Sequence, residues 1–255
     1  MPNYKLGKLP PVVDSRTLLF GAYLTPQLPA PPAQENYGQK VATWPMYGND
    51  QYGDCTCAAV GHMIQNWTAT AKGEVTPPLQ SIMSLYEHFV GTPPPPDAGC
   101  SLLVVLRHWK KAGVDGHTIQ AYALLKVGDE VQAKDALWCF GTIYIGLALP
   151  DFAVPANTDL STIPWVVPAS GATGNAAKNP NNGHCVPAVA YDDENLYVVT
   201  WGAVKSMSWE FYTAYSDEAF AVLSQDFIDA NGQAPQGFDM AALEKDLSQI
   251  KAAGA

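Results

Sequence analysis

Hydrophobic side chains recur with the period of an amphipathic helix through the first half of the chain. Asp54 is a candidate helix N-cap, so a helix is predicted to begin at Cys55. Gly91 and Gly113 are typical helix ends, and they close the second and third predicted helices. The first predicted helix begins at Cys55, and the second and third cover 79–90 and 101–112. A short fourth helix is predicted over 131–137.

Further along the chain, apolar and polar positions alternate as they do in strands. The alternation predicts strands over 142–147, 186–191, 196–201 and 219–223, with a turn over 192–195. Helices followed by strands are typical of an α+β fold. We therefore expect a helical lobe (about 54–137) and an antiparallel β-sheet lobe (about 141–225), with a cleft where they meet. A charged helix with one apolar face is predicted over 238–252.

Residues 1–48 are rich in proline, which disfavours long helices and favours extended backbone. The same segment carries several large apolar side chains, at Leu18, Leu19, Phe20, Tyr23, Leu24 and Trp44. We expect an extended arm that packs on the body of a domain spanning 49–255. The alternative is an inhibitory pro-segment that occupies the cleft.

Composition narrows the class of protein. The chain has 255 residues, 47% hydrophobic and 15% charged, which is typical of a compact globular protein. Its net charge is −10 and its basic residues do not cluster, so nucleic acid and anionic membranes are poor partner candidates. The excess of acidic residues favours cationic substrates, while oligomeric state stays open.

The five cysteines are an odd number spread through the chain, which argues for reduced thiols rather than a disulfide framework. The N-terminus has no apolar core of signal-peptide length, and no apolar run approaches the ~20 residues of a membrane span. A cytoplasmic location is the default expectation, with release by lysis or a specialised secretion route left open.

Cys55 and His184 are the candidate catalytic pair. A thiol at a helix N-terminus lies near the positive end of the helix dipole and unpaired N–H groups, which favour the thiolate. His184 precedes an alternating run and can serve as base and acid. Cys57 is the rival nucleophile, but it lies about 200° around the helix from Cys55 and is expected to face the body. The other histidines, His62, His88, His108 and His117, are expected in packing or surface roles.

This layout resembles the papain-like cysteine peptidase superfamily, and most closely its bacterial and phage-type members, in which an Asp-Cys pair opens the central helix. The resemblance covers about 44–223 and rests on short motifs: the Asp54-Cys55 pair, the Gly99-Cys100 element and the strand that ends Thr200-Trp201-Gly202. The spacing of Cys55 and His184, 184 − 55 = 129 residues, is close to the roughly 130–150 of papain-type enzymes.

The resemblance implies roles for further residues. Family spacing places the side-chain amide that stabilises the oxyanion at Asn49, six residues before Cys55, while Gln51 has the family's spacing only if Cys57 is the nucleophile. Both stay candidates. The asparagine or aspartate that orients the family's histidine is absent, and Thr200 occupies the corresponding strand end, with Trp201 beside it as a shield.

We therefore expect a thiol-dependent hydrolase that cleaves a peptide or amide bond of a peptide or protein substrate, without a cofactor. Trp44, Gly53 and Trp201 are expected to contribute to substrate binding. The alternatives are a transamidase or acyltransferase, and a papain-fold binding or structural module that has lost catalysis. A zinc site built from Cys55, Cys57, His184 and Cys185 is disfavoured, because structural zinc pairs are usually separated by at least two residues.

Overall fold

The computed structural model describes residues 4–71, 73–227, 241 and 245. Its α-helices are α1 (Cys55–Ala71), α2 (Leu79–Val90), α3 (Leu102–Ala112), α4 (Glu130–Phe140) and α5 (Trp209–Tyr215). Its strands are β1 (Glu35–Asn36), β2 (Ile119–Leu124), β3 (Ile143–Ala148), β4 (Gly183–Tyr191), β5 (Asn195–Thr200), β6 (Ala203–Ser208) and β7 (Ser216–Ser224). The helix predicted over 238–252 lies outside the described residues, apart from two isolated positions.

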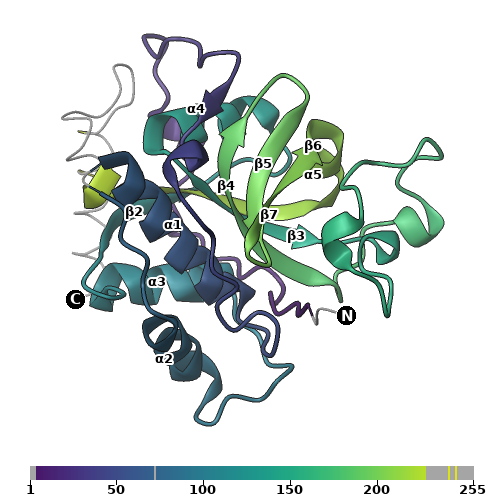
Figure 1. The fold of residues 1–255 in the computed structure, drawn as a ribbon. Coiled ribbons are helices and arrows are strands. Elements are labelled where there is room, and N and C mark those ends of the chain that lie inside the picture. The colour runs from purple at the N-terminus through teal and green to yellow at the C-terminus, as the bar shows by residue number, and fades with distance from the viewer. Residues whose placement is uncertain (1–3, 72, 228–240, 242–244, 246–255) are drawn as a thin grey trace.

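The strands form one antiparallel sheet in the order β2-β7-β3-β4-β5-β6, and the short β1 pairs with β4. Helices α1, α2 and α3 lie together on one side of the molecule, with α1 running beside β4 (Figure 1). The predicted α+β fold, with a helical lobe and an antiparallel sheet lobe, is confirmed.

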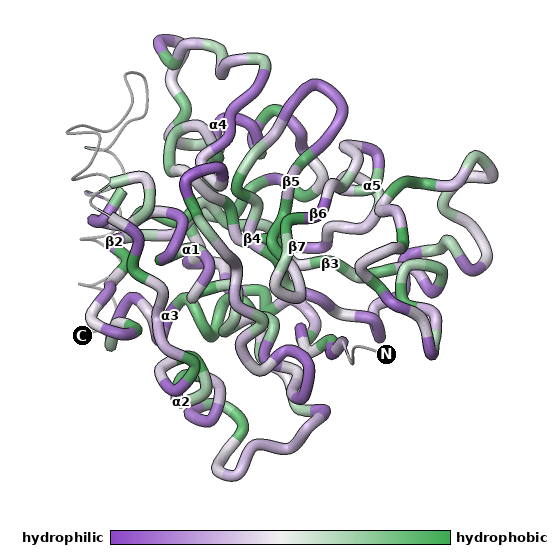
Figure 2. The backbone as a smooth tube through the Cα atoms, in the orientation of Figure 1, coloured by the Kyte–Doolittle hydropathy of each residue, from purple (hydrophilic) through white to green (hydrophobic). Residues whose placement is uncertain are grey.

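Both faces of the central strands are buried, because each face packs against a different layer. In β3, Ile143 and Ile145 belong to the core shared with α4, α5 and part of the N-terminal arm. Tyr144 belongs to the core shared with α1, α2 and α3. This alternation follows from the two-residue period of a strand. Figure 2 shows the hydrophobic positions running through the sheet, whereas the turn between β4 and β5 is hydrophilic.

Two parts of the sheet lobe differ from the sequence prediction. The helical lobe was expected to reach about 137, but β2 lies within that range and is the edge strand beside β7. Its core-facing positions include the small Ala121 and Ala123, so its alternation is a weak signal. The β6–α5 unit was also missed, because β6 is largely exposed and carries little apolar pattern.

The proline-rich arm is tied to the body along its length. Phe20 and Tyr23 are buried in the core of the sheet lobe, whereas Leu19 is 60% exposed. Glu35 and Asn36 add β1 to the sheet. Among the described residues, none of the helices is both long enough and apolar enough to cross a membrane.

Candidate active site

Cys55 is the first residue of α1, and the loop before it fixes that position. The backbone oxygen of Asp54 accepts hydrogen bonds from the N–H groups of Cys57 and Ala58, at 2.7 and 2.9 Å, so the helical pattern begins there. Gly53 lies against backbone, and a Cβ added to it would meet the Ala98 oxygen at 2.1 Å. Glycine is therefore required at this approach to the helix.

Asp54 occupies the N-cap position, but its carboxylate folds back to the loop instead of capping the first turn. Its Oδ2 accepts a hydrogen bond from the Gly48 N–H at 3.0 Å. Burial raises the pKa of Asp54 to about 7. The carboxylate thus organises the loop that carries Asn49.

His184 lies at the start of β4 and is held by residues at the end of β5. Its Nε2 is 2.7 Å from Thr200 Oγ1, and its ring stacks on Trp201 with centroids 4.7 Å apart. Its Nδ1 is buried and has no hydrogen-bond partner among the described residues. Burial lowers the pKa of His184 to about 3, so the imidazole is neutral in this state.

Helix α1 and strand β4 bring Cys55 beside Cys185, the residue after His184. The backbone N–H of Cys185 lowers the pKa of Cys55, but burial has the larger effect and raises it to about 12. The thiolate expected from the helix N-terminus is therefore not favoured in this state, because the thiol is only 2% exposed.

The two amide candidates lie in different environments. Asn49 is buried, and its Nδ2 donates to the backbone oxygens of Lys5 and Tyr52, each at 3.2 Å. Gln51 is exposed at the tip of the same loop. The Trp201 Nε1 also donates to the Lys5 oxygen at 3.2 Å. Asn49 and Trp201 thus hold one peptide carbonyl between them.

Residues 5–9 of the arm lie between the two lobes beside this pair. On the helical side, the Lys5 N–H donates to the Asn49 oxygen at 2.9 Å, and Gly7 and Leu9 exchange backbone hydrogen bonds with Cys100 at 2.9 and 3.0 Å. On the sheet side, the Gly7 and Lys8 N–H groups donate to the Gly183 oxygen at 3.2 and 3.1 Å. Gly183 directly precedes His184, so the segment covers the candidate pair.

The sequence prediction missed these contacts of residues 5–9. The large apolar side chains of the arm lie further along the chain, from Leu18 to Trp44. The only sequence feature that indicates the contacts of residues 5–9 is Gly7 between Lys5 and Lys8, followed by Pro10-Pro11. This pattern is typical of a short extended stretch whose backbone can approach another closely.

Cys57 and Trp44 have other surroundings. The Cys57 sulfur lies 3.9 Å from Thr56 Oγ1 and interacts with the Cys100 thiol in the core of the helical lobe, so it faces the body. The Trp44 ring packs against His62, with centroids 5.7 Å apart. Among the described residues, no group of three or more His, Cys, Asp or Glu side chains is placed to hold a metal ion.

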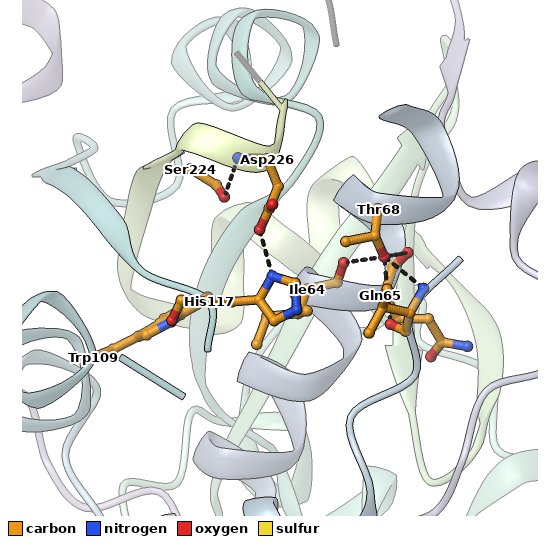
Figure 3. Close-up of polar contacts among 8 residues, drawn as sticks. Ile64, Gln65, Thr68, Trp109, His117, Ser224 and Asp226 are labelled. Atoms are coloured by element: carbon orange, nitrogen blue, oxygen red, sulfur yellow. Dashed lines mark hydrogen bonds and ion pairs between the residues drawn. The ribbon is translucent and has the colours of Figure 1, made fainter. Parts of the chain in front are cut away.

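The remaining histidines are engaged elsewhere. His62 Nε2 lies 2.8 Å from the Pro45 oxygen, and the rings of His88 and His108 are 4.1 Å apart on neighbouring helices. His117 pairs through Nδ1 with Asp226 Oδ2 at 2.6 Å, beyond the end of β7 (Figure 3). The Ser224 Oγ beside this pair accepts a hydrogen bond from the Asp226 N–H at 3.2 Å.

Comparison with solved structures gives a clear fold assignment. Xylellain, a cysteine protease from Xylella fastidiosa, aligns with a TM-score of 0.64 at 16% identity, over 87% of this chain and 96% of its own. This chain has the papain-like fold. The Carica candamarcensis cysteine protease CMS1MS2 in complex with E-64 aligns at 0.53 and 12% identity, over 75% and 98% of the two chains.

A third similar structure is procathepsin L 3 of the Tenebrio molitor larval midgut, at a TM-score of 0.55 and 12% identity, over 87% of this chain and 75% of that one. No family model matches the sequence of this papain-fold chain, and no curated protein matches it significantly. At these identities the similarity establishes the fold, and the chemistry has to be argued from the residues themselves.

Proposed function

We propose that this papain-fold chain is a thiol-dependent hydrolase of peptide or amide bonds, with Cys55 as nucleophile and His184 as acid and base. One observation carries the proposal. His184 is anchored through Nε2 on Thr200 and keeps Nδ1 without a partner among the described residues, while the next residue's N–H contacts the Cys55 sulfur. A nucleophile beside a base that a third group orients is the arrangement that covalent catalysis needs.

The proposed reaction has two halves. His184 Nδ1 takes the Cys55 proton, and the sulfur attacks the substrate carbonyl carbon to give a tetrahedral oxyanion. The imidazolium then protonates the leaving amine as the carbon–nitrogen bond breaks, which leaves a thioester. Water, deprotonated by His184, attacks the thioester and releases the acid and the thiol. Thr200 fixes the tautomer, because a base at Nδ1 requires the proton on Nε2, facing the Thr200 oxygen.

We assign the oxyanion donor to Asn49. Its Nδ2 already donates to a peptide carbonyl, that of Lys5, which supports this role over Gln51 at the exposed loop tip. Trp201 donates to the same carbonyl and stacks on His184, so we assign it to peptide binding and to shielding the His184–Thr200 contact. Gly53 supplies the open backbone beside the bound peptide.

The described state is, in this proposal, a resting state. Residues 5–9 occupy the position that a substrate peptide needs. Because they bury Cys55 and His184, the pKa of the thiol is raised and the pKa of the imidazole is lowered, so both groups stay neutral. Displacement of this segment would return both groups to water and bring the two pKa values toward each other. The two alternatives for the arm then apply to different parts of it. Residues 5–9 are the inhibitory part, and the stretch around Phe20 and Tyr23 is permanently anchored in the core.

The other expectations fit this proposal. All five cysteines are free, which supports function in a reducing compartment such as the cytoplasm. The substrate class is peptide or protein, because the occupant of the site in this structure is itself an extended peptide held by backbone hydrogen bonds.

The competing function is a binding module that has lost catalysis. The presence of Thr200 where the family has an acid or an amide favours this alternative. Alkylation by iodoacetamide at pH 6, followed by peptide mapping, distinguishes the two in a Gly7→Ala protein with displaced residues 5–9. The hydrolase predicts preferential modification of Cys55 that His184→Ala abolishes and Cys57→Ala leaves intact. E-64, present in the Carica protease structure, should block the same thiol. Equal slow labelling of all five cysteines would contradict the proposal.

A further inference from the structure

Lys8 is a buried lysine at the junction of the lobes. Its side chain is only 1% exposed, which is rare for lysine unless a carboxylate pairs with it. Its Nζ lies 2.8 Å from Asp217 Oδ2 and 3.6 Å from Glu218 Oε1, and it donates to the Leu9 oxygen at 3.2 Å. The acidic site, which we define as Gly146, Asp217 and Glu218, therefore encloses a cationic side chain.

The sheet register places the acidic site beside His184. Glu218 on β7 is the direct partner of Gly146 on β3, and the neighbouring β3 position, Leu147, is the partner of His184 on β4. The Lys8 backbone confirms this proximity, because its N–H donates to Gly183, the residue before His184. A side chain that enters the acidic site thus belongs to a peptide that lies against the catalytic pair.

Glycines make room for this occupant. A Cβ added to Gly146 would meet Lys8 Cε at 2.3 Å, and one added to Gly183 would meet the Lys8 oxygen at 2.0 Å. The site is therefore shaped for a long side chain at Gly146 and for close backbone approach at Gly183. Neither glycine has a positive φ, so the reason for glycine is space and not backbone conformation.

The acidic site has acceptor capacity that Lys8 does not use. Asp217 Oδ1 and Glu218 Oε1 are buried and have no hydrogen-bond partner among the described residues, and Glu218 is 3% exposed. Burial raises the pKa of Glu218 to about 7, against the opposing effect of Lys8. The other cation nearby is Lys178, which donates to the Ser216 oxygen and whose charge interacts with Asp217.

Buried carboxylates without a cation are costly, so the acidic site is destabilised when Lys8 leaves unless another cation replaces it. A lysine restores the ion pair, and an arginine offers five donors to the acceptors that Lys8 leaves unused. An apolar side chain would leave the Glu218 carboxylate without the cation that Lys8 supplies.

We propose that Asp217 and Glu218 form the specificity site for a lysine or arginine side chain of the substrate, and that Lys8 is its intramolecular occupant in the resting state. This inference rests on the proposed function, in that it assigns the substrate class of that same site. It also explains why residues 5–9 carry a lysine where a neutral residue would make the same backbone hydrogen bonds.

The test uses the full chain with Lys8→Ala and affinity labelling of Cys55 by iodoacetyl tripeptide amides. Lysine is placed in turn at each of the three positions and compared with norleucine, which has a similar length and no charge. We expect one position at which the lysine reagent modifies Cys55 at least about tenfold faster, because only the lysine side chain makes charge-assisted hydrogen bonds to the two carboxylates. Asp217→Asn with Glu218→Gln should remove that preference, so that the lysine and norleucine reagents modify Cys55 of this variant at similar rates.

Equal rates for lysine and norleucine at all three positions would overturn the inference. Labelling depends on the thiol and the peptide contacts but not on turnover, so it separates the two proposals. A lysine preference without hydrolysis contradicts the proposed function and supports the acidic site, whereas hydrolysis with no basic preference does the reverse. Lys8→Arg is the matched control and should keep Cys55 protected, because it retains the cation. Thermal unfolding identifies any variant that fails to fold.

Discussion

His184 Nε2 lies 2.7 Å from Thr200 Oγ1, while the opposite ring nitrogen, Nδ1, is buried without a hydrogen-bond partner in the described part of the chain. A buried nitrogen without a partner costs free energy, so its retention needs a reason. The proposed reason is function: Nδ1 is the atom that accepts the Cys55 proton, and the Thr200 hydroxyl orients the ring for that transfer.

Thr200→Val tests the orienting contact. Valine keeps the shape of threonine but cannot accept from Nε2–H, so the ring loses its tautomer control. We expect kcat to fall by between about tenfold and about a hundredfold with KM little changed. Thr200→Asn, which restores an acceptor, should recover part of the loss. Steady-state kinetics of both variants is the measurement, and a valine variant as active as the parent would contradict the assigned role.

Gly7→Ala tests whether residues 5–9 protect Cys55. The added Cβ would meet the Gly53 oxygen at 2.0 Å, and backbone cannot move aside as a flexible side chain can. If displacement costs the segment about 1.4 kcal/mol of docking free energy, the open population and the alkylation rate of Cys55 rise about tenfold.

The matched control is Gly21→Ala in the same arm, where the nearest atom is the end of the Gln132 side chain at 3.0 Å. It should leave the alkylation rate of Cys55 near that of the parent. Equal labelling of the parent and Gly7→Ala proteins would show that residues 5–9 do not limit access.

Asp54→Asn should change the pH dependence of stability. The pKa of Asp54 is raised from 3.8 to about 7 by burial, so between these values the folded state binds more protons than the unfolded state. The contribution of Asp54 to stability is therefore lost as pH rises through this range. The unfolding free energy of Asp54→Asn relative to the parent should increase by up to about 1.4 kcal/mol per pH unit between about pH 4 and pH 7.

Chemical denaturation at several pH values measures this difference. The exposed Asp193→Asn serves as control and should leave the pH dependence unchanged. A constant difference between Asp54→Asn and the parent from pH 4 to pH 7 would mean that the Asp54 carboxyl titrates alike in both states.

Substitutions of His184 and of His117 should have different effects on activity and stability. His184→Gln should abolish hydrolysis, because glutamine has no group that can take the Cys55 proton. His117→Gln removes a partly exposed pair with Asp226 and should cost at most about 1 kcal/mol of stability with activity retained (Figure 3). Activity assays beside thermal unfolding distinguish these roles, and an inactive but folded His117→Gln protein would contradict them.

The sequence was sufficient for the elements whose pattern is strong. The helices at 79–90 and 101–112 and the strands that carry His184 and Thr200 were predicted within a few residues, because their apolar periods and glycine ends are clear. The edge strand β2 was missed because its inward positions include the small Ala121 and Ala123.

The candidate site was less accessible to sequence reasoning. Cys55 and His184 could be named from the helix start and the spacing, but Lys5, Gly7 and Lys8 could not. Their contacts are mostly backbone hydrogen bonds to Asn49, Cys100 and Gly183, which any residue type can make. The acidic site could not be predicted from the sequence either, because the pairing of Lys8 with Asp217 and Glu218 joins distant parts of the chain and leaves no local pattern.

The most direct test of the account is hydrolysis of a fluorogenic peptide by three proteins: Gly7→Ala alone, Gly7→Ala with Cys55→Ala, and Gly7→Ala with Cys57→Ala. We predict cleavage by the first and third proteins and none by the second, because the sulfur of Cys55 alone contacts the Cys185 N–H beside His184, whereas that of Cys57 contacts Cys100. Cleavage that survives Cys55→Ala, or no cleavage by any of the three folded proteins, would contradict it.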